Sequence, residues 1–149
     1  MRNLFAIAVV ALLWSPLASA STKIPLFLKS QSSEGFTDPS EDRRDSEKDL
    51  LKRLKKCDEF LLVETEEEAV IVLEVLDRAE SQQHGPFAGN TQRKKTLNVR
   101  LNVGEFSAEF AGDTSLMSIG GGWGVAAKSV VNQIRDWAKE NSAKLNKMQ

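Results

Sequence analysis

The stretch LNVRLNVGEFSAEF, residues 97–110, decides the fold. Its apolar residues occupy every second position, at odd numbers from Leu97 to Val103 and at even numbers from Phe106 to Phe110. The parity changes across Gly104-Glu105, and a two-residue turn at that point makes the two apolar sets share one face. The sequence therefore predicts an antiparallel hairpin with one apolar and one polar face. A type II′ turn, with a positive φ angle at Gly104, joins its strands.

An amphipathic helix is predicted downstream of the hairpin. After the glycine run 120–122, apolar residues recur three or four positions apart from Trp123 to Trp137, and polar residues such as Lys128 and Arg135 lie between them. This spacing places one apolar stripe along a helix.

Upstream of the hairpin, the sequence predicts three strands, one helix and two polar connections. Short apolar runs predict the strands at Ile24–Leu28, Phe60–Val63 and Val70–Leu76. The helix begins at Asp38-Pro39, because aspartate caps exposed amides and proline suits the first helical position. The polar connections are an acidic turn, Glu64–Glu68, and a loop, Ser81–Lys95.

These elements give the order strand-helix-strand-strand-strand-strand-helix, which is typical of an α/β fold. We expect residues 21–149 to be a single domain with a two-layer sandwich architecture. Its mixed five-stranded sheet is parallel where the first helix crosses and antiparallel in the final meander, with both helices packed on it. Two arrangements stay open. Both helices lie on one face, which leaves apolar strand residues uncovered on the other, or one helix lies on each face.

Residues 1–20 are typical of a secretory signal peptide. Arg2 precedes an apolar run, Leu4–Trp14, that is too short to span a bilayer, and Ala18-Ser19-Ala20 is a small-x-small cleavage motif. Cleavage after Ala20 leaves no long apolar run, so we expect a periplasmic or secreted protein without a membrane anchor. A retained signal anchor is the alternative.

Composition argues against several classes of function. The chain has 20 Lys and Arg against 21 Asp and Glu, whereas a nucleic-acid-binding domain is usually basic. Cys57 is the only cysteine, so it forms no internal disulfide, although it could pair two chains. His84 is the only histidine, and a transition-metal site would need several converging carboxylates. We therefore expect no nucleic-acid partner, no metal and no cofactor.

Motifs for catalysis and phosphate binding are weak. Cys57 and His84 could in principle act as nucleophile and base, because Lys55-Lys56 would lower the pKa of an exposed Cys57 thiol. Residues 122–129 nearly match a phosphate-binding loop, but Ala127 replaces its second glycine and fits the helical stripe. We therefore assign no catalytic residue.

One loop is a candidate ligand-binding site because of its place in the predicted fold. Ser33, Phe36 and Asp38 follow the first parallel strand and precede a helix, at the sheet edge where ligands often bind. Phe36 could instead be a hydrophobic staple that packs on the helix it precedes.

Two segments carry a resemblance to known proteins: GFTDPSEDRRDSEKDLLKRL (35–54) and FLLVETEEEAVIVLEV (60–75), followed by the hairpin and a Trp-rich helix. The chain resembles a family of small exported bacterial proteins. Its topology is similar to the periplasmic α/β domain of TolB-like translocation proteins and curli-assembly lipoproteins. Those domains have an acid-Ala-Asp turn before a central strand, whereas here Glu68-Ala69 is followed by Val70. The resemblance implies a protein–protein or envelope-binding role and carries over no catalytic residue.

The sequence thus predicts an exported, non-enzymatic binding or envelope-assembly domain. We expect it to act through contacts with a protein partner or with a second copy of itself. A small extracytoplasmic hydrolase is the alternative.

Processing of the N-terminus is the first testable expectation. Protein isolated from its host should begin at Ser21, because the small-x-small motif ends at Ala20. Intact-mass spectrometry measures this directly, and a bulk population that retains Met1 would contradict it.

Overall fold

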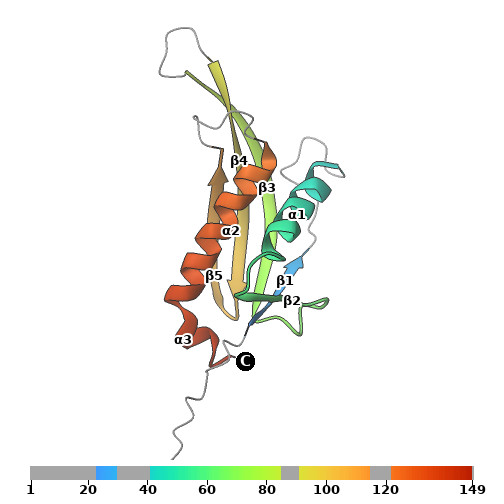
Figure 1. Ribbon diagram of the computed structural model, residues 1–149, viewed down its shortest axis with the longest axis vertical. Coiled ribbons are helices and arrows are strands. Elements are labelled where there is room, and N and C mark those ends of the chain that lie inside the picture. Colours follow the sequence, from blue (N-terminus) through green and yellow to red (C-terminus); the bar gives the residue numbers. More distant parts are fainter. Residues whose placement is uncertain (1–22, 30–40, 85–90, 115–121, 149) are drawn as a thin grey trace, which may run out of the picture.

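The computed structural model of the chain describes residues 23–29, 41–84, 91–114 and 122–148. The predicted signal peptide and the start of the first helix lie outside these ranges. The elements are β1 (Ile24–Lys29), α1 (Glu41–Leu54), β2 (Phe60–Leu62), β3 (Ile71–His84), β4 (Thr91–Val103), β5 (Phe106–Asp113), α2 (Trp123–Glu140) and α3 (Ser142–Leu145) (Figure 1).

The strands form one mixed five-stranded sheet in the order β2-β1-β3-β4-β5. β1 lies between β2 and β3 and is parallel to both, whereas β3, β4 and β5 are antiparallel neighbours. A helix between the first two strands and a final meander produce this arrangement, so the predicted α/β architecture is confirmed.

The hairpin that decides the fold has the predicted register. Val103 pairs with Phe106 and Leu101 with Ala108. Gly104 has a φ of +56°, and no described non-glycine residue, Glu105 included, has a positive φ. That combination fits a type II′ turn, since a type I′ turn needs positive φ at both central residues.

The predicted loop over residues 81–95 was wrong at both ends. β3 continues to His84 and β4 starts at Thr91, which leaves residues 85–90 outside the described structure. The paired strand ends, residues 81–84 of β3 and 91–95 of β4, have few apolar residues. They therefore lack the alternation that identifies a half-buried strand. Cross-strand ion pairs support them instead, as between Lys95 and Glu80 (3.4 Å) and between Lys94 and Asp113 (2.7 Å).

Cations also cover the aromatic residue at the start of α2. The Arg78 guanidinium lies 3.8 Å from the Trp123 ring centre, and the Lys95 ammonium lies 5.3 Å from it. Both are within the range of a cation–π interaction. The ribbon of β3 and β4 is therefore attached to the helical layer through Trp123.

Both long helices lie side by side on one face of the sheet (Figure 1). α2 packs on β4 and β5, while α1 packs on β3 and against α2. The alternative with one helix on each face is therefore wrong. The largest fully buried side chains lie between the two layers: Leu26, Leu50, Leu54, Ile71, Leu73, Leu97, Leu101, Ile134 and Leu145, with Val75, Val99 and Val130.

An ion pair fixes α2 relative to the start of β2. Arg135 donates from Nε (3.1 Å) and Nη2 (2.6 Å) to the same Oε1 atom of Glu59. The hydrogen bond from Arg135 lowers the pKa of the Glu59 carboxyl, because it favours the ionised form.

Gly112 sets how closely α2 approaches the sheet. A β-carbon at this position would overlap the backbone carbonyl oxygen of Ala126 and would lie 2.8 Å from the backbone nitrogen of Val130. Helix backbone cannot move aside as a flexible side chain can. Only glycine therefore allows the observed packing of α2 on β5.

Replacement of this glycine should loosen the two layers. We expect Gly112→Ala to lower the free energy of unfolding by about 1–3 kcal/mol or more, the usual cost of overpacking. Chemical denaturation measures this change. Ala108→Gly, on the same strand, should cost only about 1 kcal/mol. Equal stability of wild type and Gly112→Ala would disprove the close approach.

Candidate functional site

The face of the sheet opposite α1 and α2, here called the open face, is the candidate functional site. Along β1, buried Ile24 and Leu26 point toward the helices, so strand alternation turns Pro25, Phe27 and Lys29 to the open face. No described helix covers this face.

Apolar side chains occupy the half of the open face formed by β2, β1 and β3. Pro25 is in register with Leu61, and Phe27 is in register with Val72. Leu61 is 50% exposed, while Pro25, Phe27 and Val72 are half-buried. We call these four residues the apolar patch.

The acidic turn passes over the same face. Leu26 pairs with Leu62 on one side and with Ile71 on the other, so residues 63–70 must cross β1 to connect β2 to β3. Lys29, on the open face, forms a 3.1 Å ion pair with Glu66 and shows which face is crossed. Glu64 to Glu68 are all exposed, so the apolar patch has an acidic border.

The other half of the open face, on β3, β4 and β5, is polar. Arg100 lies 3.6 Å from Glu74 and donates from Nη2 to Glu109 at 2.8 Å. Asn98 donates to Asp77 at 2.6 Å. Glu74 is only 4% exposed although no helix among the described residues covers it, and its Oε1 accepts no hydrogen bond from a described residue. These polar and charged groups can fix the orientation of a partner that contacts the apolar patch.

The predicted ligand-binding residues Ser33, Phe36 and Asp38 lie outside the described residues. The elements beside them are in the predicted places, since β1 ends at Lys29 and α1 is in place by Glu41. The ligand-binding role of this loop stays a prediction.

Cys57 and His84 are far apart. Cys57 lies close to the start of β1, because the carbonyl of Glu59 accepts a hydrogen bond from Ile24. His84 lies 13 residues along β3 from Ile71, which is about 40 Å of strand. Burial raises the pKa of the Cys57 thiol, contrary to the lowering that Lys55-Lys56 suggested. The proposed nucleophile–base pair is therefore not assembled.

The segment that nearly matches a phosphate-binding loop is the start of α2. Gly122 is the N-cap residue, Trp123 begins the helix, and Lys128 is exposed on it. The glycine-rich loop that would wrap a phosphate is replaced by regular helix, so this motif has a structural role.

The described residues include neither a metal-binding cluster nor a helix that could cross a membrane. No three side chains among His, Cys, Asp and Glu come close enough there to hold a metal ion. Within the same residues, no helix has both the length and the apolar character needed to cross a membrane.

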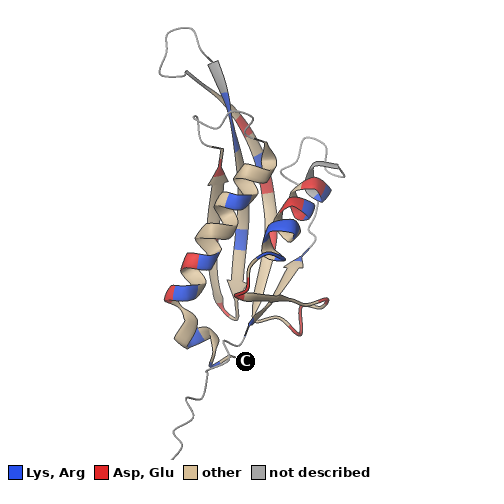
Figure 2. Cartoon of the chain, viewed as in Figure 1, with Lys and Arg blue, Asp and Glu red and all other residues tan. Residues whose placement is uncertain are grey.

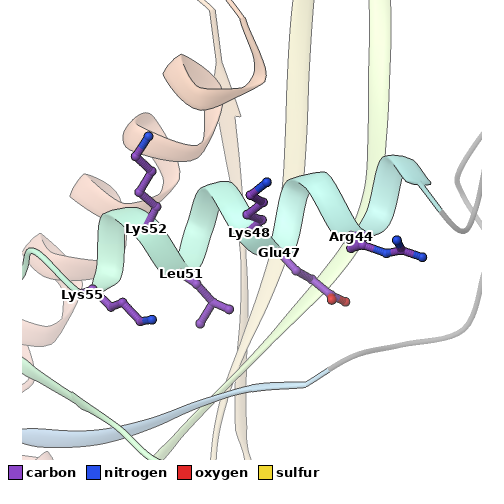
Figure 3. A pocket seen from close by; sticks show the side chains of 6 residues that line it. All are labelled: Arg44, Glu47, Lys48, Leu51, Lys52 and Lys55. Atoms are coloured by element: carbon purple, nitrogen blue, oxygen red, sulfur yellow. The ribbon is translucent and has the colours of Figure 1, made fainter.

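The outer side of α1 carries a second surface that the sequence analysis did not identify. A hollow of about 680 Å³ lies along it, lined by Arg44, Glu47, Lys48, Leu51, Lys52 and Lys55. In Figure 3, Lys48 and Lys52 extend from one edge of the helix and Glu47, Leu51 and Lys55 from the other; we call these residues, together with Arg44, the basic groove. The sequence pattern that could have revealed this surface is the four-residue spacing of Arg44, Lys48 and Lys52, which places bases on one face of a helix.

No protein-family model matches the chain. No curated protein matches it either. Among solved structures, it is similar to the hypothetical protein CT253 from Chlamydia trachomatis, with a TM-score of 0.39 and 12% sequence identity. That match covers 65% of this chain and 76% of the other.

Proposed function

We propose that this protein is an exported, non-enzymatic binding or envelope-assembly domain whose open face docks a protein partner. The observation that carries the proposal is the position of both helices on the opposite face. No described helix covers the apolar patch on β1, β2 and β3, in which Leu61 is 50% exposed and Pro25, Phe27 and Val72 are half-buried.

The composition of the open face supports a protein partner. Protein interfaces combine an apolar centre with a polar rim that remains close to water. Here the apolar patch has the acidic turn on one side and the Arg100 ion pairs on the other. Leu61, the most exposed of the four apolar residues, is suited to insert into a recess of the partner.

Export supports an envelope or extracellular setting for this contact. The features of residues 1–20 favour a periplasmic or secreted location, and the resemblance to TolB-like and curli-assembly domains implies a role in protein–protein contacts. The partner is a second copy of the chain or another envelope protein. A hydrolase that uses Cys57 and His84 has no comparable support, because these two residues lie apart.

Site-specific crosslinking tests this proposal. A photoreactive residue at Leu61 should give a discrete crosslinked product in the intact host. The same residue at Lys128, which is exposed on the helical side, should not. With a partner identified, Leu61→Asp should weaken binding by about tenfold or more, as expected for a central apolar contact.

The matched control is Lys128→Asp, which should leave affinity unchanged. Wild-type affinity in the Leu61→Asp variant, or equal crosslinking from both positions, would show that the open face is not the docking surface.

A further inference from the structure

We propose that the basic groove of α1 binds the acidic turn, Glu64–Glu68, of a second copy of this chain. The contact is distinct from docking through the apolar patch and is ionic. It joins two different surfaces, so copies associate head to tail.

The two surfaces have equal and opposite charge. The groove holds four bases and one acid, a net charge of +3. The turn holds Glu64, Glu66, Glu67 and Glu68, and Lys29 neutralises one of them, which leaves −3. The whole chain has a formal net charge of only −1, so copies do not repel each other strongly overall.

The charged groups of both surfaces are available for a partner. The bases Arg44, Lys48, Lys52 and Lys55 are exposed, and none forms an ion pair with another described residue. Within the described chain the same is true of the acids Glu64, Glu67 and Glu68.

The dimensions of the two surfaces also match. From Arg44 to Lys55 the helix rises by about 16 Å, at 1.5 Å per residue. The segment from Glu64 to Glu68 spans at most about 13 Å when extended. The groove also has an apolar residue, because Leu51 is half-buried within it.

Only another copy can supply the acidic turn to the groove. The Lys29–Glu66 ion pair holds the turn on the open face, while α1 lies on the helical face. Figure 2 shows acidic residues in the turn that follows β2, and both acidic and basic residues along α1. The acidic turn of one chain therefore cannot bind the basic groove of the same chain.

Sedimentation velocity of the purified chain that begins at Ser21, with complementary charge reversals, tests the proposal. At about 10 mM salt the mass should rise with protein concentration, and at about 1 M salt it should fall to monomer, because screening removes exposed ionic contacts. Lys48→Glu/Lys52→Glu should abolish this association, and so should Glu67→Lys/Glu68→Lys. An equimolar mixture of these two variants should associate again, because each groove then meets a turn of opposite charge.

The mixture makes the test independent of folding defects, since two misfolded variants would not restore a specific contact. Lys128→Glu/Lys147→Glu makes the same change in net charge on other exposed lysines and should associate like wild type. A monomer at every concentration and salt would overturn the proposal, as would a mixture that fails to associate. Association that persists in 1 M salt and is lost in Leu61→Asp would instead support the apolar patch alone.

Membrane lipid is the other anionic surface that the groove could contact. Flotation with vesicles of anionic and of zwitterionic lipid separates this outcome. Binding to the anionic vesicles by a chain that stays monomeric in sedimentation would replace the second copy with a lipid surface.

Discussion

The close packing of α2 on the sheet at Gly112 is the constraint on which the rest of the structure depends. Because Ala126 and Val130 lie directly above a residue without a side chain, α2 covers β4 and β5 at short range. α1 then packs beside α2 on the same face and covers β3. Both long helices therefore lie on one face of the sheet. The side chains on the open face are not covered by any described helix.

This arrangement gives the two faces of the protein different chemistry. The helical face carries an exposed row of bases on α1, and the open face carries the apolar patch and the acidic turn. The crossing of β1 by residues 63–70 produces this separation, because Leu26 must have β2 on one side and β3 on the other. Topology, rather than overall composition, therefore determines where the charges lie.

Much of the fold could be predicted from sequence where burial imposes a period. The parity change at Gly104-Glu105 predicted the hairpin register, and helical spacing predicted α2 from Trp123. The ends of the 81–95 loop were mispredicted, because ion pairs such as Lys94–Asp113 leave no apolar alternation in the sequence. The face occupied by each helix was also undetermined, since apolar strand residues fit either arrangement.

The open face of the sheet is accessible, whereas its opposite face is covered by α1 and α2, and this difference is central to the account. Thiol labelling of Val72→Cys and Val75→Cys, each in a Cys57→Ser background, tests it with side chains of equal size on one strand. Val72 is half-buried on the open face, and Val75 is 1% exposed beneath the helices. We predict rapid labelling of Cys at position 72 in the folded protein and labelling at position 75 only through unfolding. Equal protection of both positions would contradict the account.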